Sequence, residues 1–268
     1  MRTARFGIIL FCLIAAIAGL GFSRAKKRSL PPVPRRVIDL STAITPDLPV
    51  RFWGHKALSN LGFADTTEFR LVQGDTPLYY SNAYWTLFNH GGTHVDAPNH
   101  MQRGAKGVDA YALESLVGPI RLLDFRGHAQ DKPIELSEIT ALGVQPGEIV
   151  LLHVGYKPPS GPDELPSFGY LSKEAAEYLA ALPVKAFGTD GLSVDSFMRV
   201  NRLAADGAKG YETLLPVHHA FLPRGIPVIE GLVNLDALLG ESNAAFVGFP
   251  LKVPDGDGSP IRAAALLY

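Results

Sequence analysis

The sequence predicts a single mixed α/β domain, and three features of its segments support this fold class. The connections between segments vary in length, which favours a mixed sheet over a doubly wound one. No glycine-rich phosphate-binding loop stands at a junction between a strand and a helix. Strand-like segments outnumber helical ones, and there are nine of them: residues 36–41, 69–72, 79–88, 119–125, 148–154, 184–188, 227–230, 245–253 and 261–267.

Three helices are expected. The clearest runs from its N-cap Ser172 to Leu182, where Pro183 ends it. A short second helix is expected at residues 137–142 (SEITAL). A third is expected at residues 212–221, although a proline interrupts its middle.

Residues 1–25 are predicted to be a secretory signal peptide or an N-terminal membrane anchor. Arg2 and Arg5 precede an uncharged, mostly apolar run at residues 6–22, and Ser23 and Ala25 suit a cleavage position. The run is slightly shorter than the ~20 residues that a membrane span needs. More basic residues follow the run than precede it. If the segment stayed uncleaved and spanned the membrane, these charges would favour the orientation opposite to export, with the domain inside. We expect export, to the periplasm or the exterior, with membrane contact only through this segment if it stays uncleaved.

A linker at residues 26–35 is expected to lead into a folded domain at residues 36–268. Six of the 25 basic residues and none of the 26 acidic ones lie in residues 1–28, so the remaining chain has a formal net charge of −7. An acidic domain without a basic stripe is a poor binder of nucleic acid. Since the only cysteine is Cys12 in the apolar run, any metal in the domain must be bound by nitrogen and oxygen.

Three of the eight histidines lie within eleven residues, in the stretch NHGGTHVDAPNH at residues 89–100. Imidazole and carboxylate together suit zinc, manganese or iron(II). His94 and Asp96 are two residues apart, so both side chains would point to one face of an extended segment. Gly91, Gly92 and Pro98 disfavour a helix, so we expect a turn running into a strand. The alternative is a histidine-rich surface loop, or histidines that are satisfied by hydrogen bonds in the core.

A second candidate group contains Glu230 and the pair His218-His219. Glu230 ends the apolar segment IPVIE, where an unpaired carboxylate would be unfavourable. A metal ion would remove that difficulty, and so would an arginine partner such as Arg224 or Arg262. These residues alone leave both interpretations open.

Together these residues resemble the cyclase family of metal-dependent hydrolases, which includes bacterial kynurenine formamidase and isatin hydrolase. The family motif H-x-G-T-H-x-D-x-P-x-H is matched at every fixed position by residues 90–100. A second signature, a histidine twelve residues before the glutamate of G-[IV]-P-x-x-E-G-L, is matched by His218 and Glu230, which favours His218 over His219. The likeness extends through IDLSTAITPDLPV, FGTDGLSVD and GFPLKVPDGDGSPIRAAAL, and covers essentially the whole chain after the linker.

The resemblance implies the swivelling β/β/α fold, assembled as a homodimer or a larger homo-oligomer. It implies two divalent metal ions, zinc as in bacterial kynurenine formamidase or manganese as in isatin hydrolase. The general acid/base would be His100, which could instead be a further ligand. The implied ligands are His90, His94 and Asp96 for one ion, and His218, Glu230 and Asp96 for the other, with Asp96 and Glu230 bridging.

The function that the resemblance implies is hydrolysis of a small cyclic or aryl amide, a formamide or a lactam, by a metal-activated water. Lactone hydrolysis, or a dehydratase or cyclase reaction at the same metals, is the alternative among enzymes. The alternative that is not an enzyme is a metal-dependent binding protein without turnover. Phe52 and Trp53 are expected to contact the substrate ring, whereas core packing is the expectation for Trp85.

Several segments leave the substrate open. Residues 153–156 read HVGY where relatives commonly have R-T-G-W, and residues 196–212 match no formamidase pattern. The turn-rich loop at residues 158–169 could cover a pocket. In the glycine-flanked turn that follows residue 188, three polar residues either line the site or cap the turn: Asp190, Ser193 and Asp195.

Overall fold

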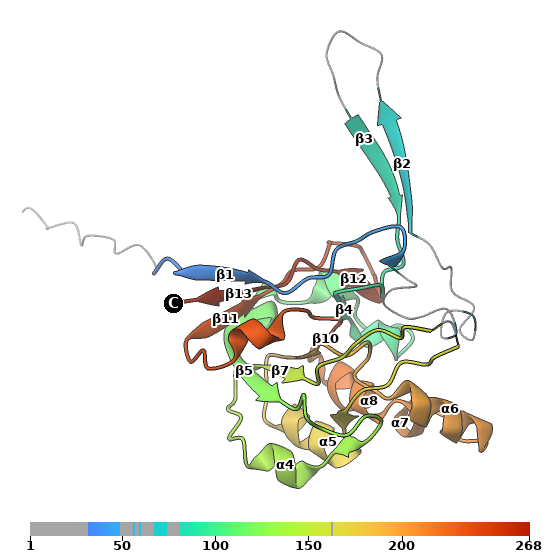
Figure 1. The fold of residues 1–268 in the computed structure, drawn as a ribbon, viewed down its shortest axis with the longest axis vertical. Coiled ribbons are helices and arrows are strands. Elements are labelled where there is room, and N and C mark those ends of the chain that lie inside the picture. Colours follow the sequence, from blue (N-terminus) through green and yellow to red (C-terminus); the bar gives the residue numbers. More distant parts are fainter. Residues whose placement is uncertain (1–31, 49–55, 57–58, 60–66, 74–80, 162) are drawn as a thin grey trace, which may run out of the picture. The chain divides into compact units, whose positions relative to one another are not determined.

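A curled nine-stranded β-sheet organises the structure, a computed structural model (Figure 1). The structure describes residues 32–48, 56, 59, 67–73, 81–161 and 163–268. The strand order is β1-β13-β11-β5-β7-β9-β10-β4-β12. Four neighbouring strands in it run parallel: β5 (Val117–Asp124), β7 (Ile149–His153), β9 (Ala186–Thr189) and β10 (Val228–Glu230). The predicted mixed α/β domain is confirmed.

The remaining strands extend this sheet on both sides or form two small sheets. Antiparallel partners in the large sheet are β1 (Arg36–Asp39), β13 (Ala264–Leu267), β11 (Ala244–Val247), β4 (His94–Asp96) and β12 (Gly258–Pro260). The small sheets pair β2 (Glu68–Gln73) with β3 (Ser81–Thr86), and β6 (Pro133–Ile134) with β8 (Tyr170–Leu171).

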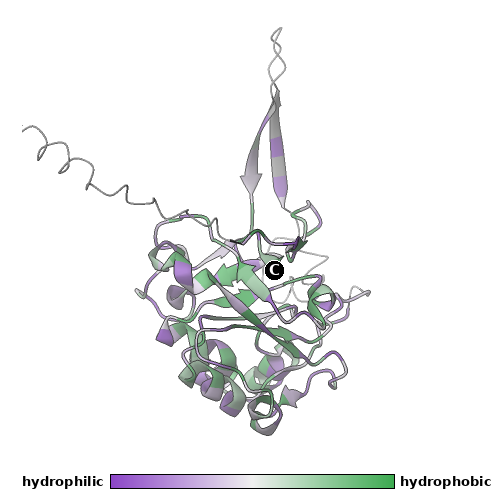
Figure 2. Cartoon of the chain, turned by 90° about the vertical axis from the view of Figure 1, so that its left-hand side faces the viewer, coloured by the Kyte–Doolittle hydropathy of each residue, from purple (hydrophilic) through white to green (hydrophobic). Residues whose placement is uncertain are grey.

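Strand β7 is buried along its whole length and contributes to a core on each face of the sheet. Val150 and Leu152 belong to a core shared with helices α5 (Lys173–Ala181) and α8 (Pro216–Phe221). Ile149 and Leu151 belong to a second core with the outer strands and the 3₁₀ helix η5 (Leu235–Leu238). A continuous apolar run is typical of a parallel strand covered on both faces, and Figure 2 shows the central strands as predominantly hydrophobic.

Two of the predicted helices form near the expected positions. Ser172 is the N-cap of α5, with its side chain accepting a hydrogen bond from the Ala175 N–H, and α5 ends before Pro183. The short helix α4 (Leu136–Thr140) begins one residue before its predicted start. Other short 3₁₀ helices are η1 (Pro98–His100), η2 (Val108–Ala110), η3 (Leu113–Leu116) and η4 (Leu222–Arg224).

The third prediction, a helix at residues 212–221 interrupted by a proline, is confirmed in its extent but not as one continuous helix. Two helices form instead, α7 (Tyr211–Leu214) and α8, with Leu215 between them at φ −126° and ψ 58°. A residue before proline is disfavoured in the α conformation, so Pro216 starts a new helix. The sequence analysis also missed α6 (Phe197–Ala205), which is capped by Ser196 and lies in the segment without a formamidase pattern.

The strand predicted at residues 245–253 is shorter than expected, since β11 ends at Val247. Pro250, which lacks an N–H, makes only an isolated bridge to Ile261. Among the described residues, none of the helices has the length and apolar character to cross a membrane. The predicted signal or anchor at residues 1–25 lies outside the described residues.

Candidate metal centre

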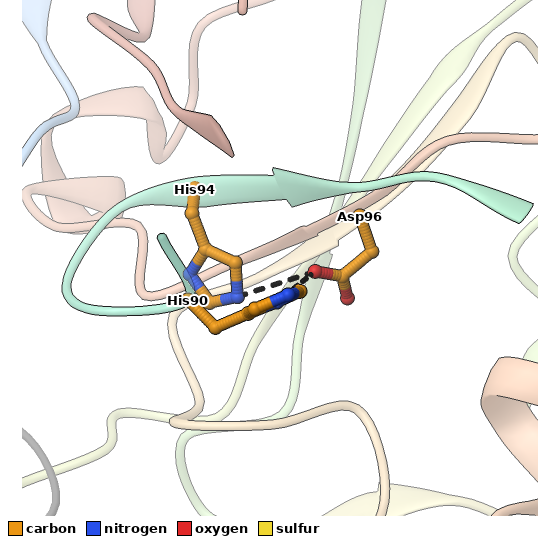
Figure 3. A group of neighbouring side chains, drawn as sticks. All are labelled: His90, His94 and Asp96. Carbon is orange, nitrogen blue, oxygen red and sulfur yellow. Dashed lines mark hydrogen bonds and ion pairs between the residues drawn. The ribbon is translucent and has the colours of Figure 1, made fainter. Parts of the chain in front are cut away.

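The histidine-rich stretch forms a turn that runs into strand β4. His94 and Asp96 lie on β4, which pairs with β10 so that His94 faces Glu230 across the two strands. The turn requires glycine at Gly92, where φ is 71° and a Cβ would lie 2.7 Å from the Thr42 side chain. Figure 3 shows that the rings of His90 and His94 both point toward the Asp96 carboxylate.

One set of donor atoms surrounds Asp96 Oδ1. His90 Nδ1 is 2.8 Å from it and His94 Nε2 is 3.4 Å from it. His94 Nε2 is also 3.4 Å from Glu230 Oε2. The strands therefore bring two histidines and two carboxylates together within a buried space.

A second set adjoins the first through the other oxygens of the same carboxylates. His218 Nε2, from helix α8, lies 3.5 Å from Asp96 Oδ2 and 3.2 Å from Glu230 Oε1. Asp96 and Glu230 thus face His94 with one oxygen and His218 with the other. All five side chains named as ligands in the sequence analysis lie in this one buried cluster.

The cluster fits metal ions on three grounds. Two ligands of a tetrahedral ion lie about 3.4 Å apart when each is about 2.1 Å from it, and four of these contacts measure 3.2 to 3.5 Å. The His94 Nε2 and Asp96 Oδ2 atoms are buried without a hydrogen-bond partner among the described residues, which is unfavourable unless another group binds them. Nitrogen and carboxylate oxygen are also donors that divalent transition metals accept.

The charges of the metal-free cluster favour protonated histidines. Burial by itself would lower the pKa of His94, but the charges of Asp96 and Glu230 outweigh burial and raise that pKa to about 10. Burial also acts against the charged form of His218, yet hydrogen bonds to the surrounding carboxylates raise its pKa well above the ordinary value. An ion that binds these nitrogens must displace their protons.

Polar groups behind the cluster orient its histidines. The Asp195 carboxylate accepts hydrogen bonds from His218 Nδ1 at 2.8 Å and from the backbone N–H groups of Val217 and His218, both at 3.1 Å. His94 Nδ1 donates to the Gly92 carbonyl at 2.8 Å. Both histidines therefore present Nε2 to the centre of the cluster, as metal-binding histidines do when their other nitrogen is hydrogen-bonded.

Glu230 is held in a similar way. Its Oε1 accepts hydrogen bonds from the Ser193 hydroxyl at 3.1 Å and the Val194 N–H at 2.8 Å. Ser193 and Asp195 therefore support the site rather than merely capping a turn. The arginine alternative for Glu230 is wrong, because the described contacts of both candidates lie elsewhere: Arg224 donates to the Ala220 carbonyl and Arg262 pairs with Asp39.

Asp257 is a residue of this site that the sequence analysis missed. Its Oδ2 lies 3.0 Å from His90 Nε2 and 3.6 Å from His100 Nδ1, and its Oδ1 accepts a hydrogen bond from Asn89 at 2.7 Å. The next residue, Gly258, packs directly against the His90 ring, since a Cβ there would lie 2.5 Å from the ring. The family-like segment GFPLKVPDGDGSPIRAAAL was the only signal for Asp257, because the spacing in the chain does not connect it with His90.

His100, on η1, lies at the edge of the cluster. Its ring centroid is 4.1 Å from that of His90 and 5.9 Å from that of His218. It is half-buried, and burial lowers its pKa below the ordinary value. Its ring also lies within ligand reach of Asp96 and His218, so the geometry accommodates either an acid/base or a ligand.

A cavity of about 410 Å³ opens beside the cluster. The cluster residues His90, His218 and Glu230 line it together with His100 and Asp257. Its apolar lining is Phe88, Met101, Phe197, Val200 and Leu215.

The three aromatic residues discussed in the sequence analysis, two expected at the substrate and one in the core, have different outcomes. Phe52 and Trp53 lie outside the described residues. The expected core packing of Trp85 is wrong, since 64% of this residue is exposed. It lies on β3, which among the described residues pairs with β2 alone, and neither described core includes it.

A second cavity, of about 770 Å³, lies beside the ends of β7 and β10, and Pro158 and Pro159 of the predicted turn-rich loop line it. At its wall Asp190 accepts hydrogen bonds from His153 Nδ1 at 2.7 Å and from the N–H groups of Val154 and Gly155. Asp190 therefore fixes the end of β7 and belongs to this cavity, not to the metal cluster.

Comparison with known proteins shows which sequences and structures this chain is similar to. The cyclase family model matches residues 38–196. Kynurenine formamidase of Salinibacter ruber is 32% identical over 182 residues, 66% of this chain and 76% of the relative. Kynurenine formamidase of Maricaulis maris is 28% identical over 225 residues, 84% of this chain and 95% of the relative. Isatin hydrolase A from Labrenzia aggregata, solved with benzyl benzoate, has the same fold, with a TM-score of 0.66, 22% identity and coverage of 87% of this chain and 93% of that one.

Proposed function

Because this chain belongs to the cyclase family, we propose that it is a metal-dependent hydrolase that cleaves the amide bond of a small aryl or cyclic amide. The buried cluster carries the proposal, because it combines a metal-binding donor set with an adjacent cavity, and its His94 Nε2 and Asp96 Oδ2 atoms lack a hydrogen-bond partner among the described residues. The names of the sequence relatives support a formamide or a similar aryl amide as the substrate.

Two divalent ions are proposed, zinc first and manganese as the alternative, since the nitrogen and oxygen donors suit both. His90, His94 and Asp96 would hold one ion, and His218, Glu230 and Asp96 the other. Ions bound there lower the pKa of a water molecule and polarise a carbonyl oxygen. Asp96 Oδ1 faces His94 and Asp96 Oδ2 faces His218, which supports a carboxylate shared by the two ions.

His100 is proposed as the general acid/base. Its lowered pKa leaves the ring neutral at pH 7, so it can accept the proton of the attacking water. The water oxygen adds to the carbonyl carbon, the C–N bond breaks, and His100 returns the proton to the leaving nitrogen. Asp257 lies beside His100 Nδ1 and would favour the tautomer with the proton on Nδ1, leaving Nε2 as the base.

The test is a substrate screen with metal-loaded protein. Formanilide, N-formylkynurenine, isatin and a simple lactone are assayed side by side, with His94→Ala and Asp96→Asn as site variants and Asp206→Asn as an exposed control. Amide or lactam hydrolysis that both site variants lose and the control retains is the expected result. Full activity in either site variant would refute the site, and lactone hydrolysis alone would replace the amide assignment.

Export and assembly are further proposals that come from the sequence. The N-terminal segment supports export or tethering, which cell fractionation of the full chain tests. The family resemblance supports a homodimer or larger homo-oligomer, which light scattering on purified protein tests. A cytoplasmic location or a monomer would refute the corresponding proposal.

A further inference from the structure

Helix α6 is amphipathic and borders the cavity beside the metal cluster. Each of its nine residues is half-buried or exposed. Phe197 and Val200 are three residues apart, so they share one face of the helix, and both line the cavity. A surface helix ordinarily packs such a face into a core. Here Phe197 packs against the core shared with α5 and α8, and both Phe197 and Val200 also border the space beside the metal ligands.

The apolar face of α6 continues along the cavity into neighbouring elements. Leu215, which precedes α8, lines the same cavity, as do Phe88 and Met101 from either side of the histidine-rich stretch. We call Phe197, Val200 and Leu215 the α6 wall. A cavity of about 410 Å³ with apolar walls and a few polar groups has the dimensions of a small-molecule site.

The charged groups of the cavity are acidic, apart from its histidines. Asp195 and Glu230 are bound within the cluster, and Asp257 lies partly exposed beside His90 and His100. The described lining residues include no lysine or arginine.

The two arginines of α6 are held elsewhere. Arg199 donates to the carbonyls of Thr213 and Leu214, and Arg202 pairs with Asp131. Neither guanidinium belongs to the described lining of the cavity. A substrate carboxylate in this space would meet Asp257 and an apolar wall, with no cation of the described lining to balance it.

We propose that the α6 wall selects the substrate, and that this substrate is an uncharged aryl amide rather than one that carries a free carboxylate, such as an amino acid. This inference rests on the proposed function and specifies its substrate class. It assigns a role to residues 196–212, the segment that matches no formamidase pattern in the sequence.

A matched pair of substrates tests the proposal by turnover. Formanilide and 4-formamidobenzoate contain the same aryl formamide and differ by one ring carboxylate. We expect kcat/KM of the metal-loaded protein to be at least tenfold higher for formanilide. Val200→Lys places a cation in the α6 wall and should shift the ratio at least tenfold toward 4-formamidobenzoate. Asn201→Lys adds the same charge at an exposed position of α6 and should leave the ratio unchanged.

Binding provides a readout that does not depend on hydrolysis. Acetanilide and 4-acetamidobenzoate are titrated by calorimetry into metal-free protein, where the carboxylate has no metal ion to bind. Acetanilide should bind more tightly to the wild type, and Val200→Lys should reduce or invert that preference. Phe197→Ala should weaken acetanilide binding about tenfold while zinc content stays at the wild-type level.

The outcomes separate this inference from the proposed function. Absence of turnover for every amide would refute the proposed function, while the binding comparison would still decide the role of the α6 wall. Equal or better use and binding of the carboxylate compounds by the wild type would overturn the inference. So would equal shifts in Val200→Lys and Asn201→Lys, because the effect would then come from overall charge.

Discussion

Replacement of Asp195 by asparagine should weaken metal binding at the His218 side of the cluster. Asp195 is not one of the proposed ligands, but its carboxylate accepts three hydrogen bonds, two from backbone N–H groups and one from His218 Nδ1. An asparagine can supply an accepting oxygen on only one side, so its NH₂ group must face either the Val217 N–H or the two donors of His218. The His218 ring then loses its fixed orientation or its basicity.

The expected magnitude follows from this geometry. Loss of the hydrogen-bonded partner of a ligating histidine lowers metal affinity about 10- to 100-fold, which corresponds to about 1.4 to 2.7 kcal/mol. The opposed N–H groups should also lower the free energy of unfolding by about 1–3 kcal/mol. At about 2–4 °C per kcal/mol for a domain of this size, Tm should fall by about 2–12 °C.

The assay is zinc titration by calorimetry in the presence of a competing chelator. In Asp195→Asn the ion held by His218 should bind 10- to 100-fold more weakly, while the ion held by His90 and His94 keeps its affinity. Asp206→Asn, at the exposed C-cap of α6, is the control and should match the wild type. Wild-type affinity for both ions in folded Asp195→Asn would refute the role of Asp195.

Three further predictions concern pH, the acid/base and stability. The pKa of about 10 for His94 in the metal-free protein means that its proton must leave when a metal binds, so affinity for zinc should rise about tenfold per pH unit from pH 6.5 to 9. Zinc affinity that does not change with pH would contradict this assignment. The same raised pKa of His94 also stabilises the metal-free fold fully below about pH 6.5, and this contribution is lost as the pH rises through about 10. His100→Ala should lower kcat about 10²- to 10⁴-fold with metal content unchanged, and loss of metal, measured by mass spectrometry, would identify His100 as a ligand. Asp190→Ala should lower the free energy of unfolding by about 3 kcal/mol in denaturant titrations, because a buried histidine and two N–H groups lose their acceptor; a change below about 1 kcal/mol would contradict this account.

The features that the sequence predicted well depend on local spacing. Successive side chains of an extended segment point to opposite sides, so the two-residue interval between His94 and Asp96 places both on one side of β4. Ser172 and Pro183 bound α5 through local capping and the missing proline N–H. For the same reason, the convergence of His218 and Glu230 on this strand was predicted only through the family resemblance, since their distance from β4 in the chain carries no local signal.

The features that the sequence left open depend on pairing between distant segments. Asp257 reaches His90 across 167 residues, because β12 pairs with β4. Helix α6 does carry a local signal that the sequence analysis overlooked, since Phe197, Val200 and Leu203 recur at helical spacing after the N-cap Ser196. Trp85 has a large apolar side chain of the kind that is usually buried, but it is exposed because β3 pairs with β2 outside the large sheet.

Anomalous diffraction at the zinc K edge, from crystals of the full chain grown with zinc, tests the central claim most directly. Two peaks are predicted, both within bonding distance of the Asp96 carboxylate. One should also be bonded to His90 Nδ1 and His94 Nε2, and the other to His218 Nε2 and Glu230. Absence of any anomalous peak at the Asp96 carboxylate, in crystals that contain zinc elsewhere, would contradict the assignment of this cluster as a metal centre.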